Sequence, residues 1–168
     1  VLSVQITTAG IEQRKEALLA ALVELFNPVA IILKNDNSQR QLEGLSLESE
    51  IAYGQLPGTL IIEENGAQFK IDIKKKKKTG WFYDHRSSRA LLARVAKHQR
   101  VLDLFSYTGA WGIPAAMAGA SEVTCVDASE GALALAKENA RLNRVDENMH
   151  FVRNDVFEFL KQARLDRL

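Results

Sequence analysis

Apolar runs of strand length alternate with segments of helical period along the second part of the chain. The three apolar runs begin at Val101, Glu122 and Met149. In each segment that follows, small or apolar residues recur at helical spacing. These helical segments are 109–118, 129–142 and 156–164. The repeated order of strand and helix predicts an α/β fold with a parallel sheet and right-handed crossovers.

The first part of the chain has a different pattern. Residues 11–26 predict an amphipathic helix that ends at Asn27-Pro28. Leu18, Leu22, Leu25 and Phe26 are spaced to share one face of this helix. A strand is predicted at 29–33, and the pattern over 59–73 predicts a hairpin that turns at 63–66. We therefore expect a small α+β domain at 1–76, followed by half of a Rossmann-like domain at 77–168.

The composition is that of an ordinary globular protein. Of 168 residues, 46% are apolar and 26% are charged, and the net charge of +1 does not by itself indicate a nucleic-acid partner. The single cysteine excludes an internal disulfide framework. No apolar run reaches the roughly 18 residues of a membrane span, and no secretion signal is visible. We therefore expect a soluble cytoplasmic protein.

An acidic residue ends each of the three predicted strands. These residues are Asp103, Asp127 and Asp155. In open parallel sheets, ligands bind outside the carboxyl ends of the strands, and an acid on the second strand commonly accepts hydrogen bonds from ribose hydroxyls. The pattern therefore predicts a ligand that contains a nucleoside.

The turn after the first strand indicates which kind of nucleotide is bound. A dinucleotide site needs Gly-x-Gly-x-x-Gly, whereas residues 106–112 contain only Gly109 and Gly112, beside bulky Tyr107 and Trp111. A pyrophosphate would fit this turn poorly. An uncharged or zwitterionic nucleoside such as S-adenosylmethionine suits Asp103 and the backbone amides better.

Residues 79–86, Thr-Gly-Trp-Phe-Tyr-Asp-His-Arg, place three aromatic side chains beside charged groups. Successive side chains of a strand alternate between its faces, so we expect some of these rings to line a pocket. The alternative is that Trp81 and Tyr83 pack in the core and Arg86 forms a surface ion pair. Ser87 or Ser88 is expected to cap a helix that runs to about Lys97. Its predicted buried positions are Leu91, Leu92 and Val95.

Lysines occupy every position of 74–78. Such a run is typical of a solvated loop, because like charges repel and remain in water. It could instead face phosphates, since each lysine that neutralises a phosphate adds salt-dependent affinity. The run alone does not identify a partner.

Four segments together resemble a known family. Residues 103–109 (Asp-Leu-Phe-Ser-Tyr-Thr-Gly), 126–129, 154–155 and the block 78–86 are similar to class I S-adenosylmethionine-dependent methyltransferases that act on large-subunit ribosomal RNA. The most similar subfamily is the cytosine-5 type with an N-terminal PUA domain. The resemblance implies S-adenosylmethionine as cofactor and large-subunit ribosomal RNA as substrate.

The resemblance also implies the cofactor-binding residues. Those around the methionine part and sulfonium would be Asp103, Phe105, Tyr107, Thr108 and Gly109. Asp127, followed by Ala128 and Ser129, would hold the ribose, and Asn154 and Asp155 would contact the adenine. Phe82 and Arg86 would close the pocket.

The chain departs from this family in several places. Lys76 and Lys77 stand where the family has a Gly-Gln pair. We also expect this chain to lack the PUA domain and the segments that supply the family's catalytic cysteine. Methylation of cytosine carbon 5 needs a thiolate nucleophile, and Cys125 lies inside a predicted strand as a packing residue. No catalytic residue is therefore identified, and the three histidines show no metal-ligand spacing. We expect either part of a longer chain or self-association through an exposed sheet edge.

Two other functional classes share part of this pattern. A nicotinamide-dependent oxidoreductase would have the same alternation of strands and helices, but the missing glycines disfavour it. A non-catalytic RNA-binding module could use the lysine run and the aromatic residues for charge and stacking. Binding of S-adenosylhomocysteine (SAH), NAD or RNA would distinguish the three.

Overall fold

The computed structural model describes residues 1–71 and 81–165, so the lysine run 74–78 and Thr79-Gly80 lie outside the described residues. Contacts divide the chain into two units, Val1–Gly58 and Thr59–Leu168. This division falls earlier than the expected boundary at 76/77, because the hairpin at 60–71 packs on helix α6 (Glu130–Leu142) and so belongs to the second unit. No helix within 1–71 and 81–165 has the length and hydropathy needed to span a membrane.

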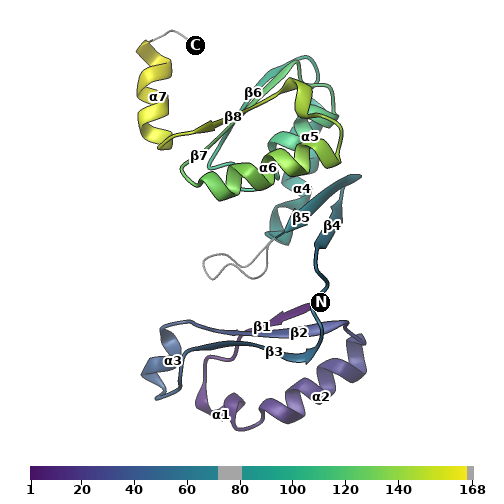
Figure 1. The fold of residues 1–168 in the computed structure, drawn as a ribbon, viewed down its shortest axis with the longest axis vertical. Coiled ribbons are helices and arrows are strands. Elements are labelled where there is room, and N and C mark those ends of the chain that lie inside the picture. The colour runs from purple at the N-terminus through teal and green to yellow at the C-terminus, as the bar shows by residue number, and fades with distance from the viewer. Residues whose placement is uncertain (72–80, 166–168) are drawn as a thin grey trace. The chain divides into compact units, whose positions relative to one another are not determined.

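The second unit is built on the predicted parallel sheet (Figure 1). Strands β6 (Arg100–Leu104), β7 (Glu122–Asp127) and β8 (Met149–Arg153) pair in parallel in the order β6-β7-β8. The register pairs Asp103 with Cys125, and Cys125 with Phe151. The α/β fold class is thus confirmed, and among the described strands only β7 pairs with β6.

The crossover helices agree closely with the hydrophobic pattern. They are α5 (Gly112–Met117), α6 (Glu130–Leu142) and α7 (Val156–Leu165). The Ser129 hydroxyl accepts a hydrogen bond from the Ala132 amide at 3.3 Å, so the predicted cap of α6 is confirmed. Val123 and Cys125 of β7 are fully buried against Ala140 of α6 and Ile113 of α5 in the core of this unit.

Helix α4 (Arg86–Val95) differs from the prediction. Its N-cap is His85, so Ser87 and Ser88 lie inside the helix and neither caps it. Leu91 and Val95 are exposed, while Arg89 is buried. The prediction of buried residues is therefore wrong for Leu91 and Val95, whereas Leu92 is half-buried. The ion pair of Arg89 with Glu64 turns the Arg89 side of the helix inward.

The predicted hairpin is confirmed and belongs to the second unit. Strands β4 (Leu60–Glu64) and β5 (Ala67–Ile71) pair antiparallel across a turn at Asn65-Gly66. Both turn residues have positive φ, as a two-residue hairpin turn requires. Alternate residues of β5, Ala67, Phe69 and Ile71, are buried in the core of the unit.

The first unit is a three-stranded sheet with three helices. Strand β2 (Ala30–Asn35) pairs in parallel with β1 (Leu2–Val4) and antiparallel with β3 (Glu48–Gly54). The predicted helix 11–26 is divided into α1 (Ala9–Glu12) and α2 (Lys15–Phe26), and α3 (Gln39–Leu42) is one short turn. Leu25 and Phe26 are exposed, so the apolar face predicted for this helix is not buried at its C-terminal end.

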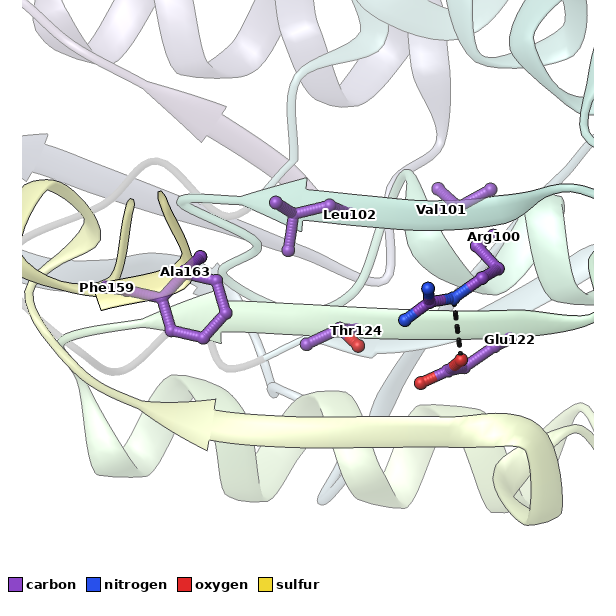
Figure 2. Close-up of a pocket in the computed structure, with 7 residues that line it drawn as sticks. All are labelled: Arg100, Val101, Leu102, Glu122, Thr124, Phe159 and Ala163. Carbon is purple, nitrogen blue, oxygen red and sulfur yellow. Dashed lines mark hydrogen bonds and ion pairs between the residues drawn. The ribbon is translucent and has the colours of Figure 1, made fainter. Parts of the chain in front are cut away.

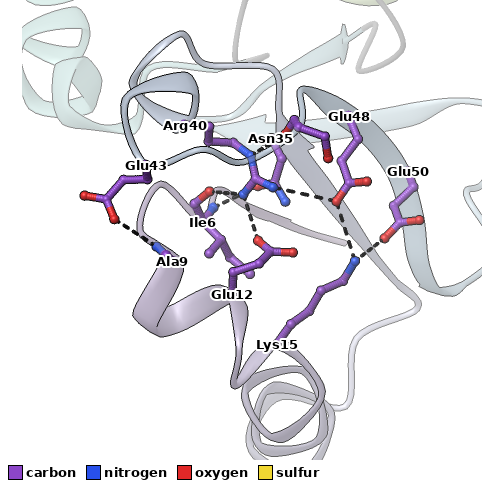
Figure 3. A network of polar contacts seen from close by, with 10 residues as sticks. Ile6, Ala9, Glu12, Lys15, Asn35, Arg40, Glu43, Glu48 and Glu50 are labelled. Carbon is purple, nitrogen blue, oxygen red and sulfur yellow. Dashed lines mark hydrogen bonds and ion pairs between the residues drawn. The ribbon is translucent and has the colours of Figure 1, made fainter.

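A buried arginine connects the helices and strands of the first unit (Figure 3). The Arg40 guanidinium donates to the Ile6 carbonyl, to Glu12 Oε2 at 2.8 Å and to the Ser46 carbonyl at 2.8 Å. Its fully buried charge is thus balanced by a carboxylate and by backbone carbonyls. Arg40 therefore has a structural role in the first unit.

Candidate cofactor site

The loop that follows β6 has an unusual backbone. Phe105, Tyr107 and Gly109 all have positive φ (56°, 48° and 79°), so every second residue is left-handed. Left-handed φ is unfavourable for the two aromatic residues and costs on the order of 1 kcal/mol each, whereas glycine tolerates it. The amide of Ser106 donates to the Val126 carbonyl at 3.1 Å, which holds the loop against β7. The loop thus lies at the carboxyl ends of two neighbouring strands.

Asp103 lies buried under this loop. Its Oδ2 accepts a hydrogen bond from the Gly112 amide at 2.9 Å, at the start of α5. Burial raises the pKa of Asp103 to about 6; the hydrogen bond from Gly112 opposes this shift, and the charge of Asp127 adds to it. A cationic ligand group beside Asp103 would favour the ionised form.

Gly112 allows α5 to come this close to the sheet. A Cβ at this position would lie 2.9 Å from Cys125 Sγ and 3.2 Å from Asp103 Oδ2, closer than side chains normally pack. Cys125 is fully buried in β7, as predicted. Burial raises the pKa of its thiol, and Asp103 raises it further, while a contact from the Ser106 hydroxyl acts in the opposite direction. The Cys125 thiol is therefore protonated and packed.

Asp127 is held in place by two backbone amides. Its Oδ2 accepts from the Tyr107 amide at 2.9 Å, and its Oδ1 accepts from the Ser129 amide at 2.8 Å. Each carboxylate oxygen has a further lone pair that can accept a hydrogen bond from a ligand. The Ser129 amide donates to Asp127, while its hydroxyl accepts from the Ala132 amide. Ala128, between Asp127 and Ser129, is exposed.

Thr108 is enclosed within the same loop. The residue is fully buried, and its hydroxyl Oγ1 finds no hydrogen-bond partner among the residues that the structure describes. Its carbonyl accepts a hydrogen bond from Asn139 Nδ2 of α6 at 3.2 Å. An unpaired buried hydroxyl in a ligand loop is consistent with a polar partner that a bound ligand or water would supply.

Asn154 and Asp155 follow β8, at the same end of the sheet. The Asn154 amide donates to the Asp127 carbonyl at 3.2 Å, so these two residues are neighbours. Asp155 Oδ1 accepts from the amides of Phe157 and Glu158 at 2.9 and 3.1 Å, so Asp155 caps α7. Its predicted contact with adenine would therefore have to use the other carboxylate oxygen, Oδ2.

The aromatic block 81–86 divides into a buried part and an exposed part. Trp81 is buried and donates from Nε1 to Glu64 Oε2 at 3.0 Å, as the core-packing alternative predicted. Phe82 and Tyr83 are exposed. The ring of Phe82 stacks on His85 at 5.9 Å between centroids, and His85 contacts Trp111 at 5.7 Å. Through Trp111 the block reaches the loop 105–112. The Arg86 side chain lines a hollow with Glu64 and Asn143, and within the part of the chain that the structure describes it has no contact with this loop.

The residues that hold this block were not found from the sequence. Arg89 forms a bidentate ion pair with Glu64, at 2.7 Å (Nε to Oε1) and 2.9 Å (Nη2 to Oε2), and also donates to the Phe82 carbonyl at 2.8 Å. Burial raises the pKa of Glu64, but hydrogen bonds from Arg89 and Trp81 outweigh this effect, and the net shift is downward. The Arg89 guanidinium also lies over the Trp81 ring, 4.7 Å from its centroid.

A separate pocket of about 270 Å³ lies between the sheet and α7 (Figure 2). Its lining residues are Arg100, Val101, Leu102, Glu122, Thr124, Phe159 and Ala163. Phe159 and Ala163 of α7 lie across from the strand residues, and Arg100 pairs with Glu122 at 3.0 Å. None of the predicted cofactor residues lines this pocket, so it is distinct from the candidate site.

Comparison with known proteins agrees with this geometry. The profile of the S-adenosylmethionine-dependent methyltransferase family matches residues 46–166. A relative from Tolumonas auensis, named ribosomal RNA large subunit methyltransferase I, is 42% identical over 95% of this chain and 41% of its own length. A relative of the same name from Escherichia coli O139:H28 is 40% identical over 97% of this chain and 42% of its own length. The chain thus spans about two fifths of the length of the curated relatives it matches.

Solved structures give the same result. A protein from Streptococcus mutans, assigned as an S-adenosylmethionine-dependent methyltransferase, aligns with a TM-score of 0.83 and 30% identity over 99% of this chain and 43% of its own. A crystal structure of a protein assigned as a methyltransferase, complexed with SAH, aligns with a TM-score of 0.84 and 30% identity over 99% of this chain and 42% of its own. Since the family profile covers most of the sequence, the chain belongs to the S-adenosylmethionine-dependent methyltransferases.

Proposed function

We propose that this chain carries the methyl-donor site of an RNA methyltransferase. The observation that carries the proposal is the pair of buried carboxylates at adjacent strand ends, with Asp127 oriented by the amides of Tyr107 and Ser129. The unpaired Thr108 hydroxyl and the raised pKa of Asp103 also fit a ligand with polar and cationic groups. S-adenosylmethionine has both.

Each residue has a defined role in this proposal. Asp127 accepts hydrogen bonds from the ribose hydroxyls through the lone pairs that the backbone leaves open. Asp103 accepts a hydrogen bond from the amino group of the methionine part, and this contact favours the ionised carboxylate. Phe105, Tyr107, Thr108 and Gly109 form the wall around the sulfonium. When bound, the cofactor supplies an electrophilic methyl group, which the chain's residues orient.

Further residues complete the proposed pocket. Ala128 and Ser129 extend the ribose side, and Asn154 and Asp155 lie on the adenine side, where Asn154 is held next to Asp127. In this proposal Phe82, stacked on His85, closes the pocket. Arg86, which lines a hollow with Glu64 and Asn143, would have to turn toward the loop to join it. The described residues gather no cluster of three or more metal-ligating side chains, and the proposal includes no metal.

The substrate that we propose is large-subunit ribosomal RNA. Relatives that share 40–42% identity are named ribosomal RNA large subunit methyltransferase I, which supports this substrate class. The finer proposal is methylation of cytosine carbon 5, which requires a thiolate nucleophile. Cys125 is buried and its thiol pKa is raised, so it does not serve this purpose. In this proposal the chain holds the donor, and another segment or chain activates the acceptor base.

The donor proposal predicts that the chain binds SAH and not NAD. Isothermal titration calorimetry with each ligand measures this directly, because the loop 105–112 has bulky residues where a pyrophosphate would need glycines. We expect saturable binding of one SAH per chain and no heat from NAD. Binding of NAD alone would favour the oxidoreductase. Salt-dependent RNA binding without SAH binding would favour an RNA-binding module.

A further inference from the structure

Asn139 of α6 and Asn143, the C-cap residue of that helix, bond to the edge of β5 that does not pair with β4. Asn139 Oδ1 accepts from the Lys70 amide at 2.8 Å, and its Nδ2 donates to the Lys70 carbonyl at 3.2 Å. One turn further along α6, Asn143 repeats the arrangement with Gln68, at 2.8 Å and 2.6 Å. One edge of β5 pairs with β4, and the side-chain amides bond to the backbone along the other. The two residues thus serve β5 as a neighbouring strand would.

Only one of the two asparagines also reaches the cofactor loop. Asn139 Nδ2 donates a second hydrogen bond, at 3.2 Å, to the Thr108 carbonyl. The corresponding bond of Asn143 goes to the Asn139 carbonyl at 2.8 Å, within α6. Asn139 is fully buried, so all of its polar atoms are used inside the protein. It joins three segments, namely the hairpin, α6 and the loop 105–109.

The bond to Thr108 fixes a peptide plane at the centre of the loop. The Thr108 carbonyl shares this plane with the Gly109 amide, which donates to the Ser106 carbonyl at 2.8 Å and closes the turn. On either side of Thr108, Tyr107 and Gly109 hold positive φ. Without Asn139, the buried carbonyl would lose its partner and the plane could rotate.

We infer that Asn139 is a positioning residue for the donor loop, acting through the Thr108 carbonyl. This inference rests on the proposed donor site and extends it to a residue of α6, outside the loop itself. Asn139 holds the loop in the conformation that directs the Tyr107 amide toward Asp127. Loss of the Nδ2 group of Asn139 is therefore expected to weaken SAH binding.

Asn139→Asp and Asn143→Asp are a matched pair for this test. Each aspartate can still accept from the β5 amide, and each loses two donated hydrogen bonds, but only Asn139→Asp loses the bond to the loop. We expect SAH affinity to fall about 5- to 20-fold in Asn139→Asp and less than about 2-fold in Asn143→Asp, in line with the usual cost of an unsatisfied buried group. Calorimetry at a temperature where circular dichroism shows all proteins folded gives both values.

Amide hydrogen exchange supplies a readout specific to the loop. Exchange in 105–112 should accelerate in Asn139→Asp and stay near the native rate in Asn143→Asp. If the native chain binds SAH and both variants bind it equally, the inference about Asn139 is overturned while the donor site stands. If the native chain binds no SAH, the proposed function itself fails. Should Asn139→Asp not fold, the neutral pair Asn139→Ala and Asn143→Ala makes the same comparison.

Discussion

Asp103→Asn is expected to weaken SAH binding by about 10- to 100-fold, the cost of losing a charge-assisted hydrogen bond in a buried site. The asparagine side chain keeps the volume of Asp103 and an acceptor for the Gly112 amide. It removes the negative charge that, in the proposed site, would bind the amino group of the donor. Calorimetric titration of the native chain and the variant measures the difference.

Although Asp103→Asn should weaken SAH binding, it should not lower the thermal stability of the fold. Because the folded pKa of Asp103, about 6, lies above the unfolded value of roughly 4, its stabilising contribution is full below pH 4 and is lost as the pH rises through 6. At pH 7.5 the native fold therefore contains a buried carboxylate that Asp103→Asn removes. The variant should unfold at the same or a higher temperature than the native chain while it binds SAH more weakly.

The pH dependence of SAH binding provides a control. Affinity of the native chain should fall about tenfold between pH 7.5 and pH 5, as Asp103 becomes protonated. The same dependence should be absent in Asp103→Asn. An equal pH dependence in both proteins would exclude Asp103 as the group that binds the donor amine.

Arg89→Met is expected to lower the free energy of unfolding of the second unit by about 3–5 kcal/mol. Among the described residues, it leaves the buried Glu64 carboxylate with the Trp81 indole N–H as its remaining side-chain donor. It also removes the support of the Phe82 carbonyl. Urea unfolding followed by tryptophan fluorescence measures the change, because Trp81 lies in the cluster. At a pH below the pKa that Glu64 has in the unfolded chain, the loss of unfolding free energy in Arg89→Met should become smaller, because protonation removes the buried charge.

Arg100→Met is the matched control for this prediction. Arg100 pairs with Glu122 at 3.0 Å, but it is 70% exposed at the side chain, and such pairs contribute less than about 1 kcal/mol. A loss of similar size in Arg100→Met and Arg89→Met would contradict the account of the buried pair. Glu64→Gln with Arg89→Met should recover part of the stability, because no uncompensated charge remains.

The sheet and the positions of the two acidic residues could be predicted from the sequence, because they depend on local patterns. Apolar runs ending in Asp103 and Asp127 identify the strands and the end of the sheet where ligands bind. The cap of α7 also has a local signal, since Asp155 is followed three residues later by Glu158 in a capping-box spacing. Its structural role could therefore have been predicted alongside the binding role that we propose for it.

The remaining features depend on contacts between distant segments. Asn139 is 69 residues from Lys70 and 31 from Thr108, and nothing in the local pattern of α6 indicates these bonds. The inward face of α4 was predicted wrongly because Arg89 is buried by its pairing with Glu64, 25 residues away. The positive φ values of Phe105 and Tyr107 likewise arise from the attachment of the loop to β7.

The central claim is that the loop 105–109 and the acid at the end of β7 form a site for a methyl donor. A two-dimensional ¹H–¹⁵N NMR spectrum of the labelled chain, recorded during titration with SAH, tests it most directly. We expect amide shifts to concentrate in 103–112, 127–129 and 154–157, with the amides of Tyr107 and Ser129 among the largest, because both bond to Asp127. Shifts confined to the pocket around Leu102 and Phe159, or no shifts at millimolar SAH, would contradict the account.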